Sequence, residues 1–422
     1  MYYLQSVLNM KAVLFPSTIR GKIKAPQSKS IGIRLIFTSL FSDLTLRNLT
    51  YSDDVEASIR AVTALGAKVN GERFLRPRTL KLHTNFVNFG GSGTALRMFI
   101  PIAVAIGGKV TVDGDETLRK RPLSAIVKLL KDNEISVSSD HLPLTIEGKL
   151  RHTEVEIDGS ESSQYITGLV YALHILGGGK IKVRPPIVSK SYINLTVQIL
   201  KERGLDLKFD GNTITIEGGE IVPYDGNVPG DFSLSSFYAA ASIATKGCLE
   251  IKSLYDPPKF FGDHSIVEIY RQMGAYSKLE GDSWIVSGED IKDKLKPINI
   301  DVEDAPDLAV SVASLAPFTS GRTSITGVKR LSNKESNRLK TMAEALGCFG
   351  VCSYAKNETF VIAGNNNISR GKVLCPNDHR IAMMVSPLGF FAGGEIENAD
   401  CVKKSNPNFW NDLIKIGGRI KL

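Results

Sequence analysis

The sequence predicts an α/β protein with two domains, each built from three copies of one unit, with buried helices at the centre and sheets outside. Three observations support this prediction. The chain of 422 residues is long enough to bury two hydrophobic cores. A helix-ending signal recurs about every 70 residues, at positions 66, 133, 204, 274, 347 and 417. A more apolar helix pattern occurs once before each of these signals.

The first helix pattern is amphipathic and ends at a glycine in five of its six copies. In the first copy, apolar residues recur at helical spacing from Ile59 to Gly66. In the second copy, Asn133 takes the place of the glycine. Asparagine is the other residue that tolerates the left-handed conformation that closes many helices. Because each ending precedes a short β-prone segment, every unit should contain an amphipathic helix followed by strands.

The second helix pattern is apolar on nearly all faces, which is typical of a buried helix. Most copies lead into a glycine-rich turn and a strand, as at residues 107–112 and 177–183. The unit is therefore a buried helix, a strand, an amphipathic helix and further strands. The six copies begin near Ser30, Thr94, Ser163, Ser233, Asp307 and Asp378.

The composition predicts a soluble cytoplasmic protein. Hydrophobic residues make up 42% and charged residues 23% of the chain. The longest apolar run, near residues 98–106, is about half of what a membrane span requires, and the first ten residues lack the features of a signal peptide. The cysteines are odd in number and lack metal-site spacing, so we expect thiols in a reducing compartment. They are Cys248, Cys348, Cys352, Cys375 and Cys401.

A net charge of +8 and a pI near 9.0 indicate an anionic partner. The basic residues are spread out, and several stand singly beside glycines and serines. This pattern favours pockets for small anions over a nucleic-acid track or a membrane surface. A nucleic-acid-binding protein remains the alternative from another class, and its binding would weaken steeply with added salt.

The buried helices begin with polar residues that a hydrophobic core cannot use. The first amides of a helix are unpaired and favour anions. In the stretch from Asn88 to Arg97, glycines let the backbone approach a ligand, and Ser92 or Thr94 can cap the following helix. At each start, capping alone is the simpler interpretation. Capping does not explain four side chains, namely Lys29, Gln164, His379 and Arg380.

Three loops add further candidates. Arg121 stands just before Pro122, in an orientation suited to a carboxylate or phosphate. The segment from Ser189 to Tyr192 offers hydroxyl groups near a strand end. Lys334 and Arg338 lie four residues apart on one helix face, which could also be only a solvated face.

Nine short motifs bring these candidates together in order along the chain. With these motifs, the chain from Ile23 to Leu422 resembles the 5-enolpyruvylshikimate-3-phosphate synthases of the enolpyruvyl transferase family. The resemblance implies a two-domain inside-out α/β barrel of six βαβαββ repeats. It also implies a discontinuous division into residues 1–20 plus 230–422 and residues 21–229. The motifs are Lys29–Arg34, Gly93–Arg97, Asp113–Pro122, Gly159–Gln164, Ser189–Tyr192, Pro306-Asp307, Lys334–Arg338, Asn377–Arg380 and Lys404–Pro407.

The resemblance implies a transferase of the shikimate pathway, which supplies chorismate and the aromatic amino acids. Such an enzyme moves the enolpyruvyl group of phosphoenolpyruvate to the 5-hydroxyl of shikimate-3-phosphate and releases phosphate. No cofactor and no metal are implied. The expected partners are these two small anions, and the protein is expected to be a monomer without a nucleic-acid or membrane partner.

The family's functional residues carry over onto matching positions of this chain. Asp307 and Glu335 are the expected proton-transfer groups, and Lys29 is a third candidate. Shikimate-3-phosphate would bind Lys29, Ser30, Arg34, Ser162, Ser163, Gln164, Ser189, Tyr192, Asp307 and Lys334. Phosphoenolpyruvate would bind Lys29, Gly93, Arg121, Gln164, Arg338, Arg380 and Lys404.

The nearest alternative is the sister family, the UDP-N-acetylglucosamine enolpyruvyl transferases, which share the fold and the donor. That family commonly carries a reactive cysteine in the loop before its Arg-Pro, and the loop Asp113–Pro122 has none. This chain also departs from the family pattern at Gly91, at Gly32-Ile33 and at Arg330. These departures bear on affinity and inhibitor sensitivity more than on the reaction.

Overall fold

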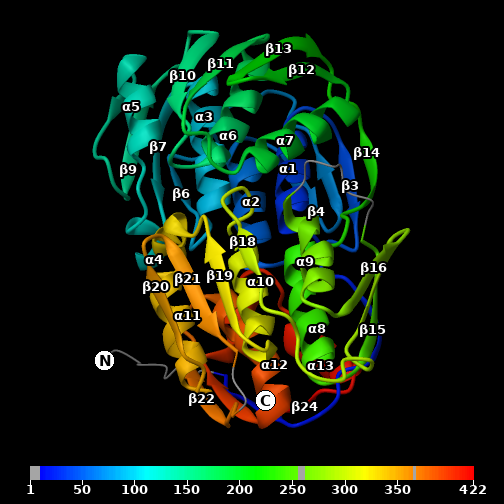
Figure 1. The fold of residues 1–422 in the computed structure, drawn as a ribbon. Coiled ribbons are helices and arrows are strands. Elements are labelled where there is room, and N and C mark those ends of the chain that lie inside the picture. The colour runs from blue at the N-terminus through cyan, green and yellow to red at the C-terminus, as the bar shows by residue number, and fades with distance from the viewer. Residues whose placement is uncertain (1–9, 255–261, 365–366) are drawn as a thin grey trace, which may run out of the picture. The chain divides into compact units, whose positions relative to one another are not determined.

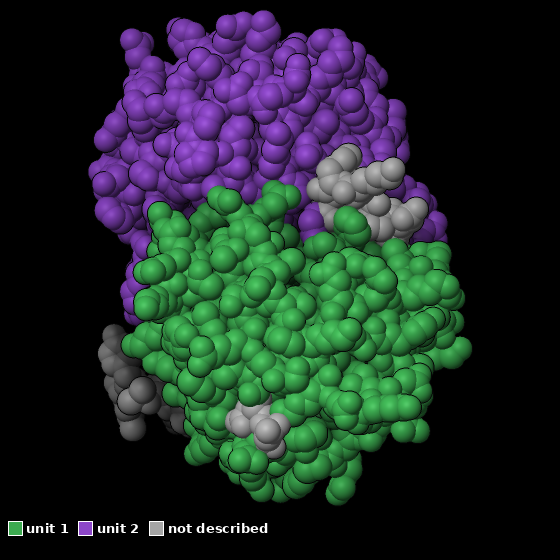
Figure 2. All heavy atoms as spheres, viewed as in Figure 1, with its two compact units in different colours: residues 1–26, 230–257, 263–422 green, residues 27–229, 258–262 purple. Residues whose placement is uncertain are grey.

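The structure is a computed structural model that describes residues 10–254, 262–364 and 367–422 (Figure 1). The chain divides into two compact units, drawn in green and purple in Figure 2. Unit 1 is described over residues 10–26, 230–254, 263–364 and 367–422, and unit 2 over residues 27–229 and residue 262. Both units are discontinuous in sequence.

Unit 2 contains three four-stranded sheets within its described residues, in the orders β14-β3-β5-β4, β6-β7-β9-β8 and β10-β11-β13-β12. The strands are β3 (Leu44–Arg47), β4 (Lys68–Asn70), β5 (Arg73–Leu75), β6 (Phe86–Asn88), β7 (Gly108–Asp113), β8 (Ser136–Val137), β9 (Leu144–Gly148), β10 (Glu154–Asp158), β11 (Gly179–Arg184), β12 (Leu205–Asp210), β13 (Thr213–Gly219) and β14 (Tyr224–Asn227).

Unit 1 has the same plan in its described residues, with sheets β2-β15-β17-β16, β18-β19-β21-β20 and β22-β23-β1-β24. The strands are β1 (Ala12–Phe15), β2 (Gly21–Lys24), β15 (Cys248–Lys252), β16 (Tyr276–Glu280), β17 (Ser283–Ser287), β18 (Asn299–Asp301), β19 (Arg322–Thr326), β20 (Ser353–Lys356), β21 (Thr359–Ala363), β22 (Gly371–Leu374), β23 (Gly394–Glu397) and β24 (Arg419–Lys421).

Every one of these described sheets follows one rule. Its first two strands are parallel, and the remaining neighbours are antiparallel, as in β10-β11-β13-β12. A parallel pair needs a crossover helix, whereas antiparallel neighbours need only a turn. Each sheet with its two helices therefore forms one βαβαββ repeat, which confirms the predicted six-repeat fold.

Two repeats are completed by strands from distant parts of the sequence. β14 joins β3 in parallel, and β1 lies between β23 and β24. β2 pairs in parallel with β15, so residues 21–26 fall in unit 1. The division expected from the resemblance placed these residues with 27–229. That division does not include the pairing of β2 with β15, because nothing in the four residues Gly21–Lys24 indicates which distant strand they pair with.

One helix of each repeat is buried, and polar side chains cap most of these inner helices. Ser92, for example, accepts a hydrogen bond from the amide of Ala95 at the start of α3. All residues of α8 and α10 are buried. The strands alternate buried and exposed residues, so each sheet has one face on the core and one toward solvent. The inner helices are α1 (Lys29–Thr38), α3 (Gly93–Ile106), α6 (Ser163–Ile175), α8 (Phe232–Ala244), α10 (Leu308–Leu315) and α12 (His379–Ala392).

The other helices are amphipathic, and four end at the predicted glycine, as at Gly66 with φ of 105°. At the other two endings, the left-handed residue is not the one at the predicted position. Asn133 has a φ of −107° and its side-chain amide donates to the Leu129 carbonyl at 2.8 Å, whereas Glu134, the next residue, is left-handed with φ of 58°. α11 ends at Gly347 as predicted, but the left-handed glycine that follows is Gly350, with φ of 77°. These helices are α2 (Asp53–Ala64), α5 (Ser124–Asp132), α7 (Lys190–Glu202), α9 (Ile266–Gln272), α11 (Arg338–Gly347) and α13 (Phe409–Lys415), with a short α4 (Glu116–Arg119).

Short 3-10 helices complete the described structure at η1 (Gly262–Ser265), η2 (Ala316–Phe318), η3 (Lys329–Asn333) and η4 (Ala399–Lys404). Cys375, after β22, and Cys401, in η4, form a disulfide. The expectation of free thiols is therefore wrong for these two residues, because spacing in sequence does not show which cysteines meet in the fold. Cys248, Cys348 and Cys352 are free and exposed. Within the described parts of the chain, no helix is long and apolar enough to cross a membrane.

Candidate active site

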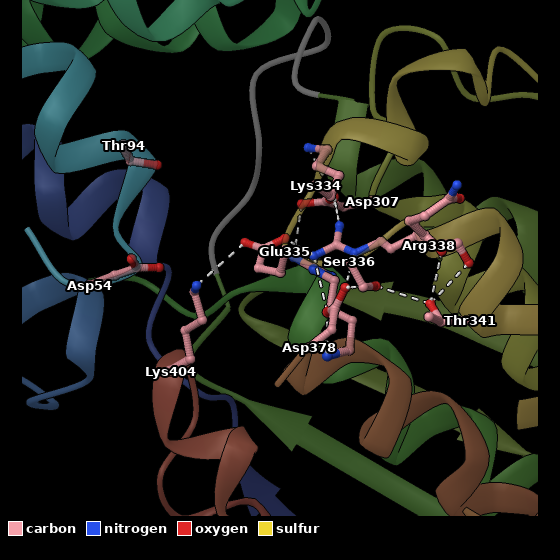
Figure 3. Close-up of polar contacts among 12 residues, drawn as sticks. Asp54, Thr94, Asp307, Lys334, Glu335, Ser336, Arg338, Thr341, Asp378 and Lys404 are labelled. Carbon is pink, nitrogen blue, oxygen red and sulfur yellow. Dashed lines mark hydrogen bonds and ion pairs between the residues drawn. The ribbon is translucent and has the colours of Figure 1, made fainter. Parts of the chain in front are cut away.

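A charged cluster, here called the unit 1 cluster, gathers where three helices of unit 1 begin (Figure 3). Asp307 precedes α10, Arg338 is the first residue of α11, and Asp378 caps α12. The members are Asp307, Lys334, Glu335, Arg338, Asp378, Arg380 and Lys404.

Asp307 is surrounded by three cations. Its Oδ1 lies 2.7 Å from Nη1 of Arg338 and 3.4 Å from Nζ of Lys334. Its Oδ2 lies 3.1 Å from Nη2 of Arg380. Burial would raise the pKa of Asp307, but the three cations together hold it well below its usual range. Burial lowers the pKa of Lys334, although the charge of Asp307 opposes this shift. Asp307 is therefore ionised at neutral pH.

Arg338 is the centre of the cluster, and only 1% of its side chain is exposed. Its Nε donates to Oδ2 of Asp378 at 2.8 Å, and its Nη2 donates to Glu335 and to Oδ1 of Asp378. Burial would lower the pKa of Arg338, but the carboxylates of Asp378, Glu335 and Asp307 outweigh burial and raise it. Ser336 donates to Asp378 at 2.9 Å. The guanidinium is thus fixed by three carboxylates from three elements.

The remaining cations lie on neighbouring elements. Arg380 donates to Oγ of Ser233 at 2.7 Å, so a residue near the start of α8 orients it. Lys404 is the last residue of η4, and its Nζ lies 4.0 Å from Oε1 of Glu335 (Figure 3). His379 is buried at the start of α12. The cluster thus offers several cations, each beside a carboxylate that could exchange for an anionic ligand.

A second group, the unit 2 cluster, lies where the inner helices of unit 2 begin. At the start of α1, Nζ of Lys29 lies 2.8 Å from Oδ2 of Asp54, a buried residue in the first turn of α2. The members predicted from sequence are Lys29, Ser30, Arg34, Gly93, Arg121, Ser162, Ser163, Gln164, Ser189 and Tyr192.

Arg34 is buried one turn inside α1 and is held by the protein itself. Its Nη1 donates to the Ser30 carbonyl at 2.8 Å, and its Nε donates to Oγ1 of Thr196 at 2.8 Å. Its Nη2 donates to the Tyr192 carbonyl at 3.1 Å, and the guanidinium lies 5.9 Å from the centre of the Tyr192 ring. Arg34 therefore joins α1 to the first turns of α7.

Gly93 lies between two guanidinium groups at the start of α3. A methyl group at this position would be 2.8 Å from Nη1 of Arg97 and 2.8 Å from Nη1 of Arg121. Both arginines are buried, and within the described residues Arg97 forms no ion pair. A glycine is needed here because any side chain would displace these cations.

Gln164, at the start of α6, is oriented from two sides. Its Nε2 donates to Oγ1 of Thr94 at 2.7 Å, and its Oε1 accepts from Nη1 of Arg97 at 3.2 Å. Ser162 caps the same helix by accepting from the Gln164 amide. The starts of α3 and α6 thus form one polar surface. Ser189 directly precedes α7 and has a left-handed φ of 51°.

Sequence reasoning did not find several contact residues. The sequence around Asp54 indicates only an acidic residue in the first turn of a helix. The sequence around Thr196 indicates only a residue on an amphipathic helix. The sequence indicates Ser233 and Asp378 only as the starts of buried helices. No local signal marks their partners, because each contact joins different elements. Arg330 donates to the Glu303 carbonyl at 2.6 Å.

No group of three or more histidine, cysteine, aspartate or glutamate side chains is arranged to hold a metal ion in residues 10–254, 262–364 and 367–422. The clusters instead combine guanidinium and ammonium groups with helix N-termini. Such groups bind phosphates and carboxylates.

Comparisons with known proteins agree with this chemistry. Residues 14–413 match the family EPSP synthase (3-phosphoshikimate 1-carboxyvinyltransferase). The chain is 51% identical over 405 residues to the 3-phosphoshikimate 1-carboxyvinyltransferase of Sulfurisphaera tokodaii, covering 96% of this chain and 98% of that one. It is 48% identical over 412 residues to the enzyme of the same name from Saccharolobus solfataricus, covering 97% and 99%.

Two solved structures share the fold. EPSP synthase from Acinetobacter baumannii has a TM-score of 0.78 at 23% identity, covering 98% of this chain and all of that one. The enolpyruvyl transferase NikO from Streptomyces tendae has a TM-score of 0.72 at 14% identity, covering 97% and 98%. At these identities the likeness concerns the fold alone.

Proposed function

The chain belongs to the EPSP synthase family, and we propose that it transfers the enolpyruvyl group of phosphoenolpyruvate to the 5-hydroxyl of 3-phosphoshikimate with release of phosphate. This places the protein in the shikimate pathway, which leads to chorismate and the aromatic amino acids. The structural observation that carries the proposal is the position of Asp307 among Lys334, Arg338 and Arg380. An ionised base among cations suits a reaction between two anions.

The reaction is an addition followed by an elimination. The methylene carbon of phosphoenolpyruvate takes a proton and becomes a methyl group, and the substrate hydroxyl, which gives up its proton, attacks the adjacent carbon. The tetrahedral intermediate then loses phosphate from that carbon and a proton from the methyl group, which restores the double bond. Cations are needed throughout, because two phosphates and two carboxylates must be neutralised. Arginine suits flat carboxylates, and lysine acts as a mobile point charge.

Asp307 is the proposed base for the 5-hydroxyl. The cations around Asp307 favour its ionised form but also make it a weak base. The anionic groups of phosphoenolpyruvate would draw Arg338 and Arg380 toward themselves. Less positive charge would then remain on Asp307, so its basicity would rise when the donor is bound.

Glu335 is the proposed donor of the proton to the methylene carbon, with Lys29 as the other candidate. Glu335 contacts Arg338 and lies 4.0 Å from Lys404, so a ligand that displaces either cation changes its proton affinity. Lys29 is paired with Asp54 and could pass a proton only if a ligand separates that pair.

The binding roles are assigned by cluster. For 3-phosphoshikimate, hydroxyl groups and cations at the starts of α1, α6 and α7 would hold the phosphate and ring, and Asp307 with Lys334 would hold the hydroxyls. For phosphoenolpyruvate, the two guanidinium groups beside Gly93 support binding. The proposed set for this donor is Lys29, Gly93, Arg121, Gln164, Arg338, Arg380 and Lys404.

A phosphate-release assay with two acceptors tests the function. Purified protein should release phosphate from phosphoenolpyruvate only when 3-phosphoshikimate is added. Release with UDP-N-acetylglucosamine, and none with 3-phosphoshikimate, would instead favour the sister reaction. The product should be identified by mass, because transfer adds the enolpyruvyl group to the acceptor.

A further inference from the structure

Unit 2 contains a cavity of about 700 Å³ that is separate from the unit 2 cluster. It lies at the C-terminal ends of α1 and α6, where Leu40, Phe41 and His174 form part of its wall. The cluster lies at the opposite ends of the same helices. A helix of ten residues, the length of α1, spans about 15 Å. The cavity is therefore not an extension of the proposed substrate site.

Part of the wall is apolar and aromatic. The Phe41 ring is nearly parallel to Tyr171, with ring centres 6.1 Å apart, and it meets the His174 ring edge-on at 4.8 Å. Burial lowers the pKa of His174, so its ring is neutral at neutral pH. Leu40 and Ile221 are buried beside these rings. This surface suits a flat apolar group.

Two arginines supply charge at the exposed side of the cavity. Arg76 and Arg78 follow β5 and line the cavity, and within the described residues their side chains form no ion pair. Arg203 lies behind the wall: it is 5% exposed and donates to Ser42 and to the Val222 carbonyl, the neighbours of Phe41 and Ile221. Among the lining residues, Glu220 is the one carboxylate. Positive charge is thus in excess.

We propose that this cavity is a second binding site, for a small organic carboxylate with a ring-sized apolar body. The carboxylate would bind Arg76 and Arg78, because guanidinium groups bind carboxylates in a bidentate manner. The ring would lie on Phe41. The volume is within the range of about 300–1,000 Å³ that is usual for small-molecule sites.

Calorimetric titration of the full chain tests this proposal with 3-phenylpropanoate as the probe and 3-phenylpropan-1-ol as its neutral counterpart. The acid should bind at least tenfold more tightly than the alcohol. The double variant Arg76→Gln/Arg78→Gln should lose this preference and keep its affinity for the alcohol. Glu220→Gln should bind the acid more tightly, because a like charge is removed.

Lys81→Gln is the matched control, because Lys81 lies in the same loop but outside the lining. It should leave the affinity for the acid unchanged. All of these variants should keep the transferase activity, which separates this site from the proposed function. Equal binding of acid and alcohol, an unchanged affinity in the double variant, or loss of binding when 3-phosphoshikimate is present would overturn the proposal.

Discussion

The Nε atom of Arg338 lies 2.8 Å from Oδ2 of Asp378, and neither side chain is more than 1% exposed. These residues are 40 positions apart in sequence, yet their pair fixes the cation at the centre of the unit 1 cluster. Because Arg338 also contacts Asp307 and Glu335, its position determines the electrostatics of both proposed proton-transfer groups.

Removing the charge of Asp378 should destabilise the protein strongly. In Asp378→Asn, the buried positive charge of Arg338 loses one of the carboxylates that neutralise it. The free energy of unfolding should therefore fall by about 3 kcal/mol. Denaturant titration measures this change. Glu344→Gln, which breaks the exposed Lys340–Glu344 pair at 3.8 Å, is the control and should leave stability nearly unchanged. Equal effects of the two variants would contradict the central role of the buried pair.

Asp307→Asn should lower kcat by about 10²–10⁴-fold, because the asparagine amide cannot accept the hydroxyl proton. Steady-state phosphate release measures the effect. Glu303→Gln, at an exposed position in the same loop, is the control for the loss of one negative charge. This variant should retain nearly full activity. A kcat for Asp307→Asn within threefold of the wild type would show that another group is the base.

Stability should fall in acid partly through Asp307. Its pKa is lowered in the folded protein, so its contribution is present above the unfolded value of about 3.9. That contribution is lost as pH falls through the folded value. The difference in unfolding free energy between wild type and Asp307→Asn should therefore be largest near neutral pH and narrow below about pH 4. A constant difference from pH 7 to 2 would disagree with this linkage.

Gly93→Ala should weaken donor binding more than stability. The added methyl group would lie 2.8 Å from the Nη1 atoms of Arg97 and Arg121, and the ends of these side chains can move aside. KM for phosphoenolpyruvate should rise by about tenfold or more, corresponding to about 1.4 kcal/mol. The free energy of unfolding should change little. Gly32→Ala, where a methyl group would meet only Val228 at 3.6 Å, is the control for adding a methyl group near a helix start.

The disulfide between Cys375 and Cys401 should contribute to thermal stability. It joins two residues with a sequence separation of 26. Closing a loop of this length lowers the entropy of the unfolded chain, which stabilises the folded protein by about 3 kcal/mol. Dithiothreitol should lower the Tm of the wild type by several degrees and have no effect on Cys375→Ser/Cys401→Ser. Cys348→Ser, at a free exposed cysteine, should behave as the wild type does. Two further thiols titrated in the untreated protein would argue against the disulfide.

Local patterns were sufficient to predict the repeats. The inner helices begin within two residues of the predicted positions, because apolar periodicity and capping by residues such as Ser92 and Asp231 act within one or two turns. The helices at Asn133 and Gly347 also end within one residue of the predicted positions, but the left-handed residue that follows is Glu134 in one case and Gly350 in the other.

The sequence alone therefore determined the six βαβαββ repeats, the helix starts that carry the charged residues and, through its motifs, the family. The tertiary structure decided the pairings between distant segments. β2 pairs with β15, Lys29 pairs with Asp54, and Arg338 pairs with Asp378. The physical reason is that secondary structure depends on near neighbours in the chain. Such pairings depend instead on which elements pack together when each unit buries its core.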